Sequence, residues 1–195
     1  MATRCPARRC CARVKHARYG DIGTYSNTVE RDGDTTTVLT EVHLKVSLLG
    51  IVLHREDAQR QERWRANRLV FFHGVTTTNG KPLEISGEAR GSGFVIASPH
   101  GTQTAPPDIH PANPWSANFL QSATMMHVDT GVVEPVRVTG GAEANVTLDG
   151  ASLPTRRYEI DGTTRYRIWL SEAEQVPVMF SVDDDTGLVT FTLAR

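Results

Sequence analysis

The sequence predicts an all-β, mainly antiparallel fold, in which a strongly curved sheet or open β-barrel is accompanied by one short helix. Three observations predict it. Apolar and polar residues alternate along many short segments, turn signals separate these segments, and the clearest helix-like pattern is short. Regular short strands of this kind are typical of a β-sandwich or barrel. The length of 195 residues suits one domain, which we expect to span residues 19–195.

Alternation marks the individual strands. In residues 41–46, Val42, Leu44 and Val46 alternate with polar side chains, which predicts a strand with one dry and one wet face. Residues 69–75 are apolar on both faces, which indicates a central strand. Residues 52–64 are long and highly charged, and their composition leaves either a helix or a long strand open.

Glycine-containing pairs predict where the chain turns. Asn79-Gly80 lies between two strand-like segments and favours a two-residue hairpin, because both turn positions require positive φ. Gly140-Gly141 and Asp149-Gly150 are further turn signals that separate short strands in the second half of the chain.

Residues 98–114 form the predicted long loop. They contain five prolines, which exclude a central strand because proline has no N–H to donate. The loop ends at Asn113-Pro114, a favourable helix cap followed by proline at the first helical position. We therefore expect a helix from Pro114 to about Ser122, docked by Trp115 and Phe119, which are four residues apart.

The first 18 residues have a different composition. They hold six Lys/Arg and no acidic residue, together with all three cysteines of the chain, Cys5, Cys10 and Cys11. No Cys or His pair follows at zinc-finger spacing. We interpret residues 1–18 as a disordered basic tail, and a metal or redox role for the cysteines is the alternative.

Charge and hydropathy bound the possible partners. The net charge is −1 and the basic residues are concentrated at the start, so the acidic body argues against nucleic acid, which requires a clustered basic face. The sequence has no run of 18 apolar residues, so we expect no transmembrane segment. It also shows no apolar leader segment of a signal peptide.

Few residues suggest a catalytic or ligand-binding role. His73 shares a predicted strand face with Leu69 and Phe71, so we expect it to point into the core, where a buried imidazole serves as a base or as a structural hydrogen-bonding group. Asp108 and His110 lie in the proline-rich loop and are candidates for an acid–base pair. Nucleophile and phosphate-binding motifs are missing from the sequence, and we expect no metal and no cofactor.

Several segments resemble a known family. They are Tyr19-Gly20-Asp21-Ile22-Gly23-Thr24-Tyr25, Trp64-Arg65-Ala66-Asn67-Arg68-Leu69, Thr76-Thr77-Thr78-Asn79-Gly80, Asn113-Pro114-Trp115, Asp129-Thr130-Gly131, Arg157-Tyr158-Glu159-Ile160, Trp169-Leu170-Ser171-Glu172 and Val176-Pro177-Val178. Together they are similar to an uncharacterised family of small exported proteobacterial β proteins, known as a domain of unknown function. These proteins in turn resemble, in style, the open half-barrels of periplasmic lipoprotein carriers and sigma-factor regulators.

The resemblance implies a highly curved antiparallel sheet whose long early strands partly wrap a short helix, and it therefore favours a strand over a helix for residues 52–64. It also implies export to the periplasm, from which the missing leader segment is a departure. It implies no activity, so no catalytic residue is carried over.

Three functions follow as hypotheses. The first is a non-enzymatic envelope protein that binds a hydrophobic or lipid-like ligand in a half-barrel cavity, with residues 104–113 as a lid. The second is a structural or protein-interaction module of the cell envelope, and the third is an enzyme with His73 or His110 as general acid or base. The residues that we expect to line the cavity are Phe71, His73, His110, Trp115, Phe119 and Trp169.

Overall fold

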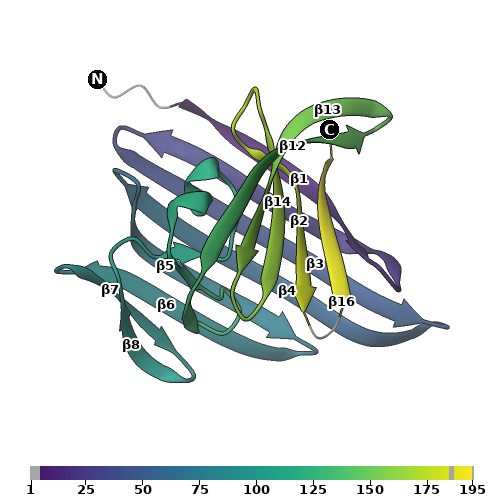
Figure 1. Cartoon of the computed structure of the whole chain (residues 1–195). Helices are drawn as coiled ribbons and strands as arrows, with labels where there is room; N and C mark the ends of the chain where they lie inside the picture. The colour runs from purple at the N-terminus through teal and green to yellow at the C-terminus, as the bar shows by residue number, and fades with distance from the viewer. Residues whose placement is uncertain (1–4, 185–186, 195) are drawn as a thin grey trace.

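The computed structural model describes residues 5–184 and 187–194, which consist mostly of antiparallel strands (Figure 1). The first eight strands are β1 (Cys5–His16), β2 (Gly20–Asp32), β3 (Thr35–Leu48), β4 (Ile51–Arg65), β5 (Arg68–Thr78), β6 (Lys81–Arg90), β7 (Gly93–Ser98) and β8 (Gly101–Ala105). A connecting segment contains β9 (His110–Pro111), the 3-10 helix η1 (Ala117–Gln121), β10 (Thr124–Met126) and β11 (Val133–Pro135). The last five strands are β12 (Arg137–Leu148), β13 (Ala151–Asp161), β14 (Arg165–Ser171), β15 (Pro177–Asp184) and β16 (Gly187–Ala194).

Thirteen strands form one sheet in the order β12-β13-β14-β15-β16-β1-β2-β3-β4-β5-β6-β7-β8, and each paired neighbour is antiparallel. The sheet is not closed, because β8 and β12 are its two edges. Strands β9, β10 and β11 form a separate small sheet. The predicted all-β class with a curved, open sheet is confirmed. Among the described residues, the structure contains no helix with the length and hydropathy that crossing a bilayer requires.

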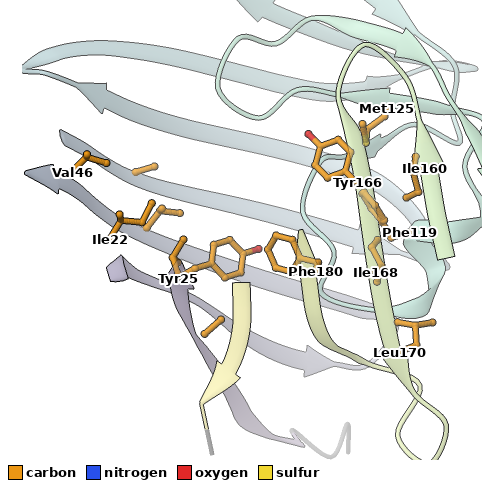
Figure 2. Packing of buried hydrophobic residues seen from close by; sticks show 14 residues of the cluster. Ile22, Tyr25, Val46, Phe119, Met125, Ile160, Tyr166, Ile168, Leu170 and Phe180 are labelled. Atoms are coloured by element: carbon orange, nitrogen blue, oxygen red, sulfur yellow. The ribbon is translucent and has the colours of Figure 1, made fainter. Parts of the chain in front are cut away.

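The sheet curves so strongly that its two arms face each other. Figure 1 shows β12–β16 lying across the concave side of the long strands β1–β5. One apolar cluster accordingly joins side chains from both arms, including Tyr25 and Val46 on one side and Ile168 and Phe180 on the other (Figure 2). A second cluster fills the concave side of β3–β8 around Phe72, and a third lies between β12, β13 and β15. The main core is therefore the space enclosed by the curvature.

Strand β1 contradicts the expectation of a disordered tail. Strand β1 pairs with β2 from Cys5 to His16, and its residues 11–16 also pair with β16 on the other side. Ala12, Val14 and His16 are buried, whereas Arg13 and Lys15 are exposed, which is the period-two pattern of a half-buried strand. The prediction failed because this alternation covers only five residues and the basic composition around it is typical of a solvated segment. The placement of residues 1–4 and the side chain of Cys5 lie outside what the structure describes.

Two further predictions for the first half of the chain are confirmed. Residues 52–64 lie in β4, which pairs with β3 and β5 along its length. Asn79 and Gly80 connect β5 to β6 with φ values of 51° and 81°, as a hairpin turn with two positive φ angles requires.

Gly140-Gly141 is not a turn, contrary to the prediction. It lies inside β12, where the register with β13 shifts between Gly140 and Ala142. Gly140 has a φ of 110°, and a Cβ atom there would lie 2.6 Å from the Arg157 main-chain oxygen. Glycine is required here because the bulge brings two main chains together. Asp149-Gly150 does form the turn between β12 and β13.

The predicted helix is shorter than expected. Residues 114–116 precede η1, and the residue at its N-terminal cap is Ser116, not Asn113. The Asn113 side chain instead bonds to side chains of β2, β3 and β4. Since the loop side chains Ile109, His110 and Asn113 are buried, this segment is a plug in the concave face of the sheet. Loop residues that bond to the sheet are not free to form a helix cap.

Candidate functional site

A cavity of about 480 Å³ lies between the two arms of the sheet. Most of its wall is apolar, and its lining residues come mainly from strands β1–β4 and β14–β16 of the large sheet. The apolar and aromatic lining residues are Tyr19, Ile22, Tyr25, Val42, Leu44, Val46, Leu53, Ala112, Val128, Tyr166, Phe180, Val182, Val189 and Phe191. The polar lining residues are His16, His54, Glu56, Arg60, His127, Asp129 and Thr164. A cavity of this size and character falls in the range of small-molecule sites, about 300–1,000 Å³.

Strand alternation explains the apolar wall. Val42, Leu44 and Val46 occupy the inward positions of β3, as their spacing predicts. On the opposite arm, Phe180 stacks on Phe191 with ring centroids 4.2 Å apart and planes within 8°. The Tyr25 ring lies edge-on to both at 5.5 Å. These contacts fix the aromatic side of the cavity.

The cavity reaches solvent at one end of the sheet. Leu53 and Asp129, both exposed, belong to its lining. The hairpin between β3 and β4 turns at this end, and its tip exposes Leu48, Leu49, Ile51 and Val52 together with Leu53. Leu49 is 95% exposed. A contiguous apolar tip on a protein surface is typical of sites that contact a partner, a ligand or a lipid, and here it borders the cavity opening.

Arg60 is the buried cation of the cavity wall. It lies on the inward face of β4 and is only 8% exposed. Gly74 lies opposite it on β5, and a Cβ atom there would be 3.2 Å from Arg60 Cγ. The missing side chain of Gly74 therefore gives the arginine stem its space.

Glu62, two residues further along β4, is 1% exposed. Its Oε2 accepts hydrogen bonds from Trp64 Nε1 at 2.8 Å and Trp115 Nε1 at 3.1 Å. Its Oε1 accepts one from Asn113 Nδ2 at 2.5 Å. Burial raises the pKa of Glu62 to about 7, although the hydrogen bonds from Asn113, Trp64 and Trp115 oppose this rise. The carboxyl group therefore titrates near neutral pH.

Asn113 extends this network to strands β2 and β3. Its amide donates to Thr40 Oγ1 at 3.0 Å, and Thr40 Oγ1 donates to Asn27 Oδ1 at 2.6 Å. The Tyr25 hydroxyl donates to Asn113 Oδ1 and accepts from Asn27 Nδ2. Burial raises the pKa of Tyr25 above its ordinary value, so the hydroxyl stays protonated and able to donate. The network attaches the plug to three strands and places Tyr25 at the cavity wall.

The positions of the expected lining residues differ from the prediction. Among the described residues that line the cavity, none is Phe71, His73, His110, Trp115, Phe119 or Trp169. Trp115 lines a second, smaller pocket of about 50 Å³ instead. The structure brings Trp115 and His110 together around Trp64, with ring centroids 5.9 Å and 4.8 Å from it. It does not bring them to Phe71, His73, Phe119 or Trp169.

Phe71 and His73 point away from the core, contrary to the expected orientation. The register between β4 and β5 pairs Arg63 with Phe71 but Trp64 with Leu69, so Val70 is an extra residue. This bulge reverses the alternation after Leu69. The side chain of His73 is 43% exposed and its Nε2 lies 3.0 Å from Glu84 Oε1. The Phe71 ring lies under the Arg63 guanidinium, 4.1 Å from its centroid.

The remaining expected residues serve packing. Phe119, in η1, belongs to the cluster between the arms, and Trp169 packs in the third cluster beside Val146 and Val178. Trp115 lies before η1, which begins at Ala117, so Trp115 and Phe119 do not share one helix face. His110 is buried, and burial lowers its pKa. Within the described residues, its Nε2 has no hydrogen-bond partner.

The geometry does not assemble the expected acid–base pair. His110 Nδ1 lies 3.0 Å from the main-chain oxygen of Asp108, so the contact does not involve the carboxylate. His127 instead forms a close pair with Glu134, whose Oε1 lies 2.6 Å from its Nε2. Glu134 also accepts hydrogen bonds from the main chain and side chain of Thr163, both at 2.6 Å. The bonds between Glu134 and Thr163 link β11 to the turn before β14.

The structure places two of the three cysteines and the candidate metal ligands. Cys10 and Cys11 are free thiols on β1. In residues 5–184 and 187–194, no group of three or more His, Cys, Asp or Glu side chains is arranged to hold a metal ion.

The sequence prediction missed Arg60 and Glu62. The signal was present, since Ala58, Arg60, Glu62 and Trp64 are spaced two apart and are all buried. Placing Trp64 inside would have placed the two charged residues inside as well. Their hydrogen-bond partners come from distant segments, so only the fold reveals which groups contact them.

A search of curated proteins finds no match to the chain. A family model described as a domain of unknown function, DUF6134, matches residues 18–193. This match covers the plug, β2 to β15 and nearly all of β16, and it begins after β1. The chain therefore belongs to the DUF6134 family.

Proposed function

We propose that this protein is a non-enzymatic binding module that holds a hydrophobic, lipid-like small molecule in the cavity between the arms of its sheet. The observation that carries the proposal is the cavity of about 480 Å³ with its mainly apolar wall. Transfer of apolar ligand surface from water to such a wall is favourable by about 25 cal/mol per Å².

Two features support this proposal. The cavity opens beside the apolar hairpin tip of β3 and β4, so an apolar ligand meets apolar side chains outside the cavity as well as inside. The plug residues 109–113 are attached to three strands by hydrogen bonds, so they hold the wall in shape before a ligand arrives, which lowers the cost of binding. The exported location implied by the family resemblance is part of the proposal.

A structural or protein-interaction module of the envelope is the second candidate, and the exposed tip residues Leu49 and Ile51 favour it. It requires a partner at the tip and no ligand in the cavity. An enzyme using His73 or His110 gains no support from the geometry, because His73 lies on the outer face and His110 is enclosed beside Trp64.

Uptake of the neutral fluorophore N-phenylnaphthylamine, excited beyond the absorption of tryptophan, tests the proposal. We expect saturable binding by the wild type. Leu44→Trp fills the cavity from the inward face of β3 and is expected to weaken binding at least about tenfold, or ~1.4 kcal/mol. Leu39→Trp adds the same indole to the outer face of the same strand and is expected to leave binding within about twofold.

The outcome separates the two candidates. Wild-type protein that takes up no fluorophore, or a Leu44→Trp variant that binds like the wild type, overturns the cavity proposal. Failed uptake by the wild type would favour the interaction module.

A further inference from the structure

The cavity wall contains one strongly basic group in an otherwise mainly apolar surface. Arg60 projects from the inward face of β4, with Ala58 and Glu62 as its inward neighbours on the strand. Its side chain is 7% exposed. Burial of a guanidinium is costly unless its charge is compensated and its N–H groups are bonded, so its partners decide what it does.

Those partners leave Arg60 poorly satisfied. Its Nη2 donates to Thr76 Oγ1 at a long 3.2 Å. Within the part of the chain that the structure describes, its Nε is buried and has no hydrogen-bond partner. A guanidinium has five N–H donors and remains charged at all physiological pH values. Arg60 therefore has donors to offer to an acceptor inside the cavity.

Nearby carboxylates compensate the charge only in part. Glu56 Oε1 lies 4.0 Å from Arg60 Nη2, and the other oxygen of Glu56 lies 3.8 Å from His54 Nε2. Charge-assisted hydrogen bonds are typically about 2.7–2.9 Å long, so neither contact is a close pair. Glu62 is held by Trp64, Trp115 and Asn113. The other charged or titratable residues of the wall are His16, His127, Asp129 and the tyrosines Tyr19, Tyr25 and Tyr166.

We propose that the ligand of the cavity is an amphipathic anion, with a carboxylate head group on the Arg60 guanidinium and an apolar chain against the Phe180 and Phe191 side of the wall. This inference rests on the proposed function and names its ligand class. The planar fork of arginine matches the two oxygens of a carboxylate. The head group would accept hydrogen bonds from the guanidinium, which lines the cavity, and the apolar wall would exclude water and strengthen the ion pair.

Displacement of bound N-phenylnaphthylamine by three probes with the same twelve-carbon chain tests the inference. The probes are dodecanoate, dodecanol and dodecylamine, each below its critical micelle concentration at pH 8. We expect dodecanoate to displace the fluorophore at about a tenfold lower concentration than dodecanol, as for a hydrogen bond to a charged group. Dodecylamine is expected to be the weakest competitor, because its cation faces Arg60.

Arg60→Gln keeps a polar side chain and removes the charge. We expect it to reduce the preference for dodecanoate over dodecanol to within about twofold, with both displacement constants corrected for the affinity of the variant for the fluorophore. Arg63→Gln removes an exposed arginine on the outer face of the same strand and is expected to keep the wild-type preference. Arg60→Lys keeps the charge without the fork, and an intermediate preference is expected.

The outcomes distinguish this inference from the proposed function. Absence of fluorophore uptake by the wild type overturns both. Uptake with equal displacement by dodecanoate and dodecanol, or tighter binding of dodecylamine, overturns the role of Arg60 and leaves the apolar cavity standing. If Arg60→Gln does not fold, the ranking of the three probes on the wild type decides the inference, and Arg60→Lys replaces it as the variant.

Discussion

Glu62 lies in the interior with its two oxygens surrounded by N–H donors from Trp64, Trp115 and Asn113. Because burial disfavours the ionised form, the pKa of Glu62 rises to about 7 from an ordinary value of 4.5. Its proton is therefore held by the folded chain over a pH range in which the unfolded chain has released it. A single side chain thus couples the free energy of unfolding to pH.

The sign of this coupling gives a prediction. Since the folded pKa is the higher one, the stability contributed by protonated Glu62 is fully present below about pH 4.5 and is lost as the pH rises to about 7. At about 1.4 kcal/mol per pKa unit, the loss is about 3 kcal/mol. Glu62→Gln should remove this part of the pH dependence, measured by urea unfolding from pH 4.5 to 8.

The titration of His110 changes the free energy of unfolding in the opposite direction over the same pH range. Burial lowers its pKa, so its contribution to stability is lost as the pH falls below the ordinary value of about 6.5. The comparison must therefore be the difference between the wild type and Glu62→Gln at each pH. A difference that does not vary with pH would contradict the assigned titration of Glu62.

At the scale of the element, bulges decide which face of a strand a residue occupies. The extra residue Val70 reverses the inward and outward alternation of side chains along β5. The register shift after Gly140 forms a bulge in β12 where a turn was expected. Each bulge increases local twist, and both lie in strands that border the concave side. The curvature that encloses the cavity is thus accompanied by local irregularities in the ladders.

Gly140→Ala tests the bulge in β12. A Cβ atom would contact the Arg157 main-chain oxygen in a positive-φ conformation, so we expect a loss of about 1–3 kcal/mol in the free energy of unfolding. Gly150→Asn is the control, since Gly150 has a φ of 83° with open space around it, and asparagine tolerates that conformation at a cost below about 1 kcal/mol. Equal losses in the two variants would argue against a close approach at Gly140.

The sequence predicted the elements better than the site, for reasons that particular residues make clear. The alternation of Val42, Leu44 and Val46 and the Asn79-Gly80 pair are local signals, and the structure agrees with both. The orientation of His73 depended on Val70, whose extra position in the ladder has no local signature. One inserted residue is enough to turn an expected core residue outward.

The sequence did not predict the candidate site, for a different reason. Charged residues such as Arg60 and Glu62 are expected at the surface, and the groups that bond to them come from Thr76 in β5 and from Asn113 and Trp115. These are long-range contacts that only the fold brings together. Aromatic and histidine residues were the more visible candidates, but most of them serve packing.

At the scale of the whole molecule, β1 is the strand that joins the two arms. It lies between β16 and β2, so the hydrogen-bonded strand pairing of one arm continues into the other arm through β1. Val14 is 0% exposed and belongs to the cluster shared by both arms, whereas Arg13 is exposed on the outer face. These neighbouring residues allow a matched test of the strand.

Val14→Asp should destabilise the entire sheet, because it places an unpaired carboxylate in the shared core at a cost of several kcal/mol. Arg13→Asp should change the free energy of unfolding by about 0.5 kcal/mol or less. Thermal unfolding followed by circular dichroism measures both. If residues 5–16 were a disordered tail, the two variants would melt together with the wild type.

The position of β1 also constrains how the chain reaches its native state. Cys11 pairs with Ala194 and Val14 with Phe191, so the earliest of the described strands is completed by the last. During synthesis β1 must wait for β16, and such sequence-distant pairing carries a high loop-closure entropy and slows folding. Until that seam forms, β1 and β16 both present open edges, which are the places where nascent β proteins associate with other chains. We expect this seam to be the late step of folding, and the interval before it to be when the protein most needs protection from aggregation.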